Sequence, residues 1–321
     1  AIQTSRRTTL MGIPANEQDY TSLHQGVELK GDHKFWTIDG LPWDKLAPEK
    51  ADPDLVKIVK AASLVEYNAD VYAKYLCRIF HDDDTAIQRF QYWAVEEVQH
   101  GKALGVWAEA IDPSWSHEQA MSEFRKGYVP EHFITDSKDS VRGSRAGEMV
   151  ARCMVETGTS SYYTSIAEMT QEPVLKQIAK NIAGDEFRHY KMFYDTMKEN
   201  LERDKLSRFQ RLRIALGRIA ESEDDELSYA YYAANYAADP SNDEAYSRQK
   251  HNSEYMSRAG YYYRQEPLNR AVSMIFKACG YKPHTLPYDL ASKVAWWKMK
   301  SNAKAFERAR KQVSQQEKAA A

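Results

Sequence analysis

Residues 93–101 read Trp-Ala-Val-Glu-Glu-Val-Gln-His-Gly and place Glu97 three positions before His100. Side chains at positions i and i+3 project from the same face of an α-helix, with Cβ atoms about 5–6 Å apart. A carboxylate and an imidazole arranged in this way can bind the same metal ion. A single pair of this kind is common on solvated helix surfaces, so its meaning depends on the rest of the chain.

The same spacing returns in residues 185–189, Asp-Glu-Phe-Arg-His, which contain Glu186 and His189. Each of the two pairs follows a lone glutamate, Glu66 or Glu156, by a similar interval. This order is the ligand plan of dimetal carboxylate sites in ferritin-like bundles, where two helices each give one Glu and two others each give Glu-x-x-His. The repeated pattern therefore predicts a dinuclear metal site built by four helices.

The donor set indicates iron, or manganese in its place. Four carboxylates carry four negative charges, which two divalent cations would balance, and oxygen with imidazole donors suits these metals. Asp70, one helical turn after Glu66, is the alternative carboxylate on the first helix. We expect two metal ions held by six ligands: Glu66, Glu97, His100, Glu156, Glu186 and His189.

The spacing of apolar residues predicts an all-α fold with a ferritin-like four-helix bundle at its core. Glycine (14) and proline (11) are few, which suits long helices. We expect helices from Pro53 to a turn at 82–85, and over 85–110, 143–171, 173–200 and 243–279. Within a single domain, we expect an N-terminal arm over 1–50 anchored by Trp36 and Trp43, the bundle over 51–204, additional helices over 205–300 and a tail over 301–321.

Composition narrows the possible classes of protein. The net charge of −2 gives no argument for binding nucleic acid or an anionic membrane. No window approaches eighteen uninterrupted apolar residues, which predicts that there is no membrane span. Three widely separated cysteines and the lack of an apolar run behind Arg6 and Arg7 favour a cytoplasmic protein. No GxGxxG, GxxxxGK[ST] or GxSxG motif occurs.

A family resemblance appears at the residues of the metal site. Residues 93–101 resemble the W-x-x-E-E-N-R-H-G motif of the soluble acyl-acyl-carrier-protein desaturases, and residues 185–189 are similar to their D-E-K-R-H motif. Thr159 follows Glu156 by three positions, as in that family. The resemblance covers about residues 55–200, and it implies a diiron oxidoreductase that uses O2 as co-substrate.

The resemblance also implies roles for individual residues. Glu97 and Glu186 would bridge two irons, each with a terminal histidine, and Glu66 and Glu156 would complete the two sites. The implied catalytic residues are Asp185, which would orient a ligating histidine, and Thr159, which would hydrogen-bond oxygen intermediates. A back-bonded helix threonine is the alternative for Thr159. Trp93 would lie on an electron path or pack in the core, and Arg188 would pair with a nearby acid.

The expected activity is oxidation of C–H bonds as in the acyl desaturases of fatty acid metabolism. Its partners would be a small-molecule or acyl-carrier-protein-bound substrate and an electron donor such as ferredoxin, and the protein would be a homodimer. Val98, Gln99 and Phe187 depart from the family motifs, which leaves the substrate open.

Other activities fit the same ligands. A diiron oxygenase of natural-product metabolism, a hydroxylase or N-oxygenase, is the first alternative. Ile182 stands where the N-oxygenases add a histidine and counts against them. A ferritin-like iron-binding protein and a radical-generating subunit are further alternatives, and Tyr162 and Tyr163 are only loosely placed for the last.

Overall fold

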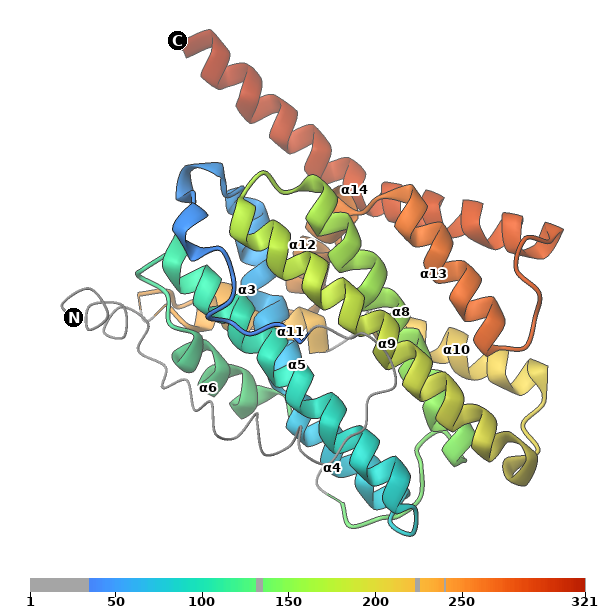
Figure 1. The fold of residues 1–321 in the computed structure, drawn as a ribbon. Helices are drawn as coiled ribbons and strands as arrows, with labels where there is room; N and C mark the ends of the chain where they lie inside the picture. The colour runs from blue at the N-terminus through green and yellow to red at the C-terminus, as the bar shows by residue number, and fades with distance from the viewer. Residues whose placement is uncertain (1–34, 131–134, 223–225, 240, 321) are drawn as a thin grey trace.

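A computed structural model describes residues 35–130, 135–222, 226–239 and 241–320. Within these residues all regular secondary structure is helical, which confirms the predicted all-α fold (Figure 1). Residues 1–34 of the predicted arm lie outside the described residues. The predicted ligands lie on four helices: α3 (Pro53–Tyr67), α5 (Asp84–Ile111), α8 (Arg145–Met169) and α9 (Pro173–Asp204). A further helix, α4 (Ala69–Ile79), directly follows α3.

Side-chain caps fix where these helices begin. The Asp52 carboxylate accepts a hydrogen bond from a backbone N–H in the first turn of α3, and Asp83 and Ser144 do the same for α5 and α8. Glu172 caps α9 and is followed by Pro173, whose missing N–H is tolerated at the first helical position. The caps satisfy N–H groups that have no partner within the helix.

The helix predicted from Pro53 to residue 81 is wrong in one respect, because it is broken at Asn68 into α3 and α4. Gly101 of α5 packs directly against this break. A Cβ atom at Gly101 would lie 2.4 Å from the backbone nitrogen of Tyr67. The close approach of the two backbones therefore requires glycine at position 101.

The predicted helix over 243–279 is also two helices, α12 (Arg248–Tyr262) and α13 (Gln265–Ala278). The backbone at the junction is extended, and the Arg264 N–H donates to the Ser165 hydroxyl of α8 at 3.1 Å. Pro267 lies in the first turn of α13, where it is tolerated, whereas in one continuous helix it would remove an internal hydrogen bond. Proline and the contact with α8 together explain the break.

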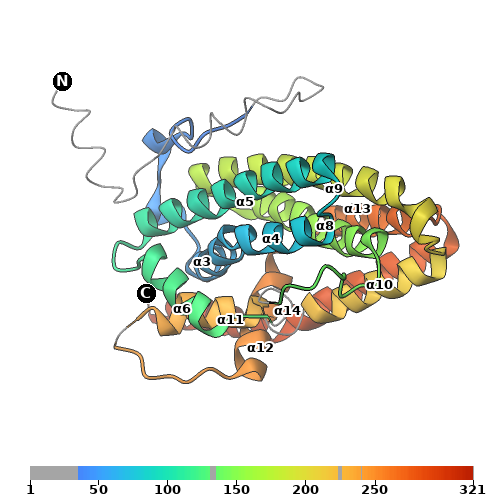
Figure 2. The same cartoon turned by 90° about the horizontal axis from the view of Figure 1, so that it is seen from below.

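The shorter and C-terminal helices cover one side of the ligand-bearing helices. In Figure 2, α5 and α9 form one layer, α3, α4 and α8 lie beneath it, and α11, α12 and α14 lie further below. Contacts join α8 with α9, α3 with α5, α11 and α12 with α3, and α13 with α8. The predicted boundary at residue 300 falls inside α14, whose C-terminal part projects away from the rest (Figure 1). The remaining elements are two 3-10 helices, Trp43–Lys45 and Pro48–Lys50, then α6 (His117–Gly127), α10 (Arg208–Ser222), α11 (Glu226–Tyr232), a π-helix (Ala233–Ala237) and α14 (Leu286–Ala320).

Two clusters of buried apolar side chains leave a polar interval between them. On α5 one cluster includes residues 86–94 and the other residues 103–108. The helices α8 and α9 divide in the same manner, and Glu156, Glu186 and His189 fall in the intervals. The core therefore surrounds the predicted ligands along the helix axes and separates them from water.

Candidate metal centre

The structure brings the six predicted ligand residues together in the interior. Their donor atoms form two overlapping groups, and within each group all of these atoms lie within 4.8 Å of one another. None of the six residues is more than 7% exposed. Asp70, the alternative to Glu66, lies outside the cluster and pairs with Arg125 near the surface. The first group is Glu66, Glu97, His100 and Glu186, and the second is Glu97, Glu156, Glu186 and His189.

Glu97 and Glu186 belong to both groups and stand between the two histidines. The Nδ1 atom of His100 is 3.3 Å from a Glu186 oxygen, and the Nδ1 atom of His189 is 2.8 Å from a Glu97 oxygen. The two imidazole rings are 5.8 Å apart between centroids. Each shared carboxylate can therefore reach two cation positions, which is the arrangement that bridging requires.

Donor atoms of five of these residues are buried without a hydrogen-bond partner. They are Glu97 Oε1, His100 Nδ1, both oxygens of Glu156, Glu186 Oε1 and His189 Nδ1. Glu97 Oε1 and His189 Nδ1 lie 2.8 Å apart, but not in the geometry of a hydrogen bond. A buried polar atom left unsatisfied costs about 1–3 kcal/mol, and more when it is charged. These ligand atoms face one another without hydrogen-bond partners, which fits a site where they would bind two divalent cations.

Electrostatics inside the cluster support the same interpretation. Burial and the neighbouring carboxylates raise the pKa of Glu66 and of Glu156 well above the usual range. Burial opposes ionisation of Glu97 too, but the adjacent imidazoles of His100 and His189 hold its pKa well below the usual range. Burial disfavours charged imidazole, yet the surrounding carboxylates raise the pKa of both histidines. The raised pKa values of these glutamates and histidines mean that bound protons reduce the negative charge of the cluster, as bound cations would do.

Each histidine is held by a carboxylate at its other ring nitrogen. Asp185 lies 3.0 Å from His100 Nε2, as expected for a residue that orients a ligand. Glu96 lies 2.8 Å from His189 Nε2. Such partners fix the ring and leave the other nitrogen directed at the metal. Both pairs cross between α5 and α9, and sequence reasoning did not identify Glu96 as the partner of His189, although it belongs to the motif.

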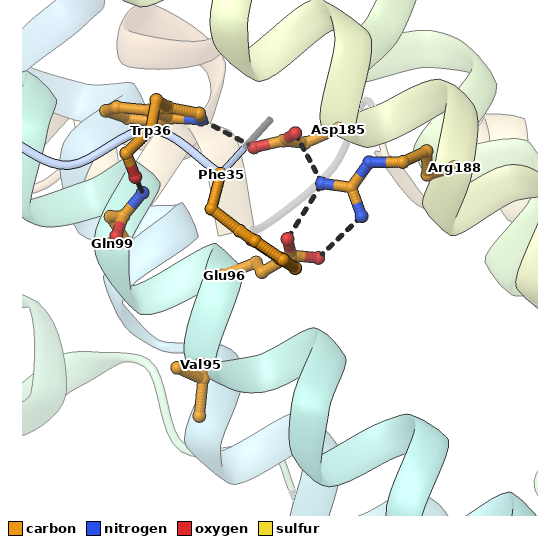
Figure 3. Close-up of a pocket in the computed structure, with 7 residues that line it drawn as sticks. All are labelled: Phe35, Trp36, Val95, Glu96, Gln99, Asp185 and Arg188. Carbon is orange, nitrogen blue, oxygen red and sulfur yellow. Dashed lines mark hydrogen bonds and ion pairs between the residues drawn. The ribbon is translucent and has the colours of Figure 1, made fainter. Parts of the chain in front are cut away.

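Arg188 links these two carboxylates, which confirms that it pairs with acids. Its guanidinium donates to Glu96 at 2.7 and 3.2 Å and also to Asp185 (Figure 3). The Tyr92 hydroxyl donates to Glu96 at 3.1 Å. One cation therefore holds the partners of both histidines in place.

The described part of the N-terminal arm covers this network. Trp36 Nε1 donates to Asp185 at 2.8 Å, and the Trp36 ring is stacked on the His100 ring. Gln99, which departs from the family motif, donates to the Trp36 carbonyl at 2.9 Å (Figure 3). Trp43 donates to the Ile38 carbonyl within the arm itself. The anchoring role expected of Trp36 is confirmed. Its stacking on His100, a predicted metal ligand, was not predicted from the sequence.

Two hydroxyl groups contact the cluster from α8. The Thr159 hydroxyl lies 2.7 Å from Glu186 and also near the backbone carbonyls of Val155 and Glu156 at 3.1 and 3.2 Å. It is therefore both back-bonded and placed at a ligand. The Tyr163 hydroxyl donates to Glu66 at 2.6 Å, so this tyrosine is closer to the cluster than its sequence position suggested.

Trp93 and Cys153 lie in the apolar core rather than in the cluster. The Trp93 ring packs edge-on against Phe193, which favours the packing interpretation. Cys153 is fully buried, and burial raises the pKa of its thiol well above the usual value. Neither side chain is placed to bind the same metal ions.

A cavity of about 610 Å³ adjoins the cluster at Thr159. Val155 and Gly158 of α8 form its wall beside the candidate ligands, and Val65 borders it from α3. This volume falls in the range of small-molecule sites, which are about 300–1,000 Å³. Tyrosines supply much of the rest of the lining, including Tyr72, Tyr128, Tyr162, Tyr229, Tyr255 and Tyr263.

Comparisons with known proteins add no family to this description. No protein-family model matches the sequence, and a search of curated proteins gave no match. In the part of the chain that the structure describes, no helix has both the length and the apolarity needed to cross a membrane.

Proposed function

We propose that the chain is a dinuclear metal oxidoreductase that uses dioxygen to oxidise an organic substrate, with iron as the preferred metal. The observation that carries this proposal is the set of buried, unpartnered donor atoms on Glu97, His100, Glu156, Glu186 and His189. Their position beside a cavity of small-molecule size supports an enzyme over a storage protein. Two bound iron ions would supply the reduction of dioxygen, which amino-acid side chains alone cannot perform.

The chain's own residues would position and shield this chemistry. Asp185 and Glu96 fix the rings of the two histidines, and Arg188 fixes both carboxylates. Thr159 holds Glu186 and lines the cavity, so its hydroxyl lies between a ligand and the substrate space. The apolar clusters on either side keep bulk water from the reacting atoms, which strengthens every electrostatic interaction there.

Desaturation as in the acyl-acyl-carrier-protein desaturases remains our first proposal for the outcome, and oxygenation is the second. Desaturation and hydroxylation both begin with removal of a C–H hydrogen, so the residues around the cluster serve either of these outcomes. The electron donor would be an external protein such as a ferredoxin. The hydrogen bond from Tyr163 to Glu66 gives the radical-generating alternative a specific basis, because an oxidisable phenol lies against a candidate ligand.

Metal analysis tests the proposal. After anaerobic loading with ferrous iron, we expect two ions per wild-type chain and fewer than two in Glu97→Ala, because Glu97 serves both cation positions. Glu199→Ala is the matched control, since Glu199 lies on α9 and pairs with Arg89 near the surface. A wild-type value well below two, or an unchanged value in Glu97→Ala, would refute the dinuclear site.

A single-turnover reaction with dioxygen then separates the outcomes by mass spectrometry and electron paramagnetic resonance. Loss of two hydrogens from a candidate substrate indicates desaturation, and gain of one oxygen atom indicates oxygenation. A tyrosyl radical signal without any product, absent in Tyr163→Phe, favours the radical-generating alternative.

A further inference from the structure

The cavity contains a buried cation that lacks a counter-ion in direct contact. Arg152 of α8 lines the cavity and is only 6% exposed. Its guanidinium lies over the Tyr72 ring, 4.8 Å from the centroid, and its Nε atom has no hydrogen-bond partner. Arg152 forms no ion pair with any described residue, although the carboxylate of Glu226, which also lines the cavity, interacts with it at longer range. This arginine is not part of the metal cluster, and the proposed chemistry does not use it.

A buried guanidinium in this state is costly. Desolvation of an ion is strongly unfavourable unless the charge is paired and hydrogen-bonded, and a cation–π contact with one tyrosine offsets only part of that cost. Arginine presents a planar fork of N–H donors that matches a carboxylate with two parallel hydrogen bonds. A side chain held in this way at the wall of a cavity is suited to receive an anion from outside.

Helix geometry places this anion site at a defined distance from the metal cluster. Arg152 and Thr159 are seven positions apart on α8, almost two complete turns, so they lie on one face about 10 Å apart along the axis. Both residues line the same cavity. Tyr162, one turn further on, also lines it, and its buried hydroxyl has no hydrogen-bond partner. The cavity thus offers a cation at one end and a hydrogen-bonding group at the other.

We propose that this cavity binds a compact aromatic carboxylate, with its carboxylate on Arg152 and its ring between the tyrosine side chains. The far end of such a ligand would reach Thr159, where a polar substituent could bond to Tyr162. The identification of this ligand as the substrate rests on the proposed function, but its binding does not. A free acid fits better than a carrier-bound thioester, because a thioester has no negative charge to place on Arg152.

Arg142 and Arg218 line the cavity as well as Arg152, so its lining carries charges of both signs. Glu148 and Glu226 also line the cavity, and Glu148 accepts hydrogen bonds from Tyr75 at 2.9 Å and Ser140 at 2.7 Å. These carboxylates would repel a dianion more strongly than a carboxylate. A neutral amide of the same shape would forgo the charge-assisted hydrogen bonds with Arg152.

Calorimetric titration of the metal-free protein tests this binding without any redox chemistry. The probes are 4-(4-hydroxyphenyl)butanoate, its primary amide and inorganic phosphate. We expect wild-type protein to bind the acid at least tenfold more tightly than the amide, and phosphate weakly. In Arg152→Gln the preference for the acid should vanish while the amide binds as before. Arg203→Gln, which changes a surface arginine of α9, should behave as wild type.

Equal binding of acid and amide to wild type, or an unchanged preference in Arg152→Gln, would overturn the proposal, as would tighter binding of phosphate than of the acid. Circular dichroism shows whether Arg152→Gln is folded, and Arg152→Lys, which keeps the charge but loses the fork, should retain part of the preference. Acid binding with normal affinity in a chain that holds fewer than two metal ions would reject the oxidoreductase function and leave this site standing.

Discussion

Replacing Arg188 by leucine tests whether the network behind the histidines contributes to metal binding. Arg188 makes three charge-assisted hydrogen bonds, two to Glu96 and one to Asp185, and its side chain is 23% exposed. Breaking a fully buried ion pair costs about 3–5 kcal/mol. Partial exposure lowers this, so we expect the free energy of unfolding of the metal-free protein to fall by about 2–3 kcal/mol.

Arg188→Leu should lower metal affinity more than a substitution that disturbs only one of the two carboxylates behind the histidines. Removing a group that orients a metal ligand typically costs about 10–100-fold in affinity. Arg188→Leu loosens the carboxylates behind both histidines, so we expect the upper end of that range, about 100-fold. Competition between the protein and a chromophoric chelator for Co2+ measures the affinity, and urea denaturation without metal measures the stability.

Two further variants sharpen this test. Arg188→Lys keeps the charge but cannot reach both carboxylates with a fork, so its metal affinity should be intermediate. Arg203→Leu removes an arginine from the surface of the same helix and should leave metal affinity unchanged. Metal affinity of Arg188→Leu within twofold of wild type would show that the histidines are oriented without this network.

Two other predictions concern the packing around the site. Gly101→Ala would place a Cβ atom 2.4 Å from the Tyr67 nitrogen and should lower the free energy of unfolding in urea by about 1–3 kcal/mol. Gly217→Ala, where a Cβ atom meets nothing within 4 Å, should not destabilise, and equal effects would contradict the reasoning. Burial lowers the pKa of His117 to about 4, so the unfolded chain takes up a proton first as the pH falls below about 6.5. Stability should therefore decline between pH 6.5 and 4, less in His117→Gln than in wild type, and parallel stability profiles would refute this.

The six clustered residues could be predicted from the sequence because residues three or four positions apart lie on the same face of a helix. Glu97 and His100 share a face wherever a helix contains them, and so do Glu186 and His189. The duplicated pattern then required four helices that face one another. The choice of Glu66 over Asp70 followed from the apolar residues beside it, and the structure places Glu66 in the cluster.

The connections between segments could not be found in this way. Trp36 is hydrogen-bonded to Asp185, which is 149 residues away in the sequence. The periodic pattern of a single helix does not predict a contact of this kind. Glu96 was visible in the motif, but its pairing with His189 depends on how α5 and α9 pack. The break at Asn68 likewise reflects the contact with Gly101 on another helix, since the residues before and after it continue a helical pattern.

Arg152 shows a different limit of sequence analysis. An arginine within a long helix ordinarily faces solvent. Arg152 stands in the apolar run Met149–Val155, which hints at burial but does not show what the guanidinium contacts. One side of its guanidinium is covered by Tyr72 of α4, a residue from a distant part of the chain. A site that depends on the burial of one charged side chain by other helices can be recognised only in the folded structure.

The two lone glutamates have different hydrogen-bond partners, although the sequence repeats them as equivalents. Glu66 is tethered by the phenol of Tyr163, whereas both oxygens of Glu156 have no hydrogen-bond partner. Seven positions after Glu66 stands Ala73, where the other half has Tyr163, so no reciprocal tether exists at the equivalent position. Glu156 also follows Val155, which lines the cavity. The repeat therefore yields one glutamate held by a phenol and one whose oxygens face His189 without a hydrogen bond, so a bound cation would orient Glu156 more than Glu66.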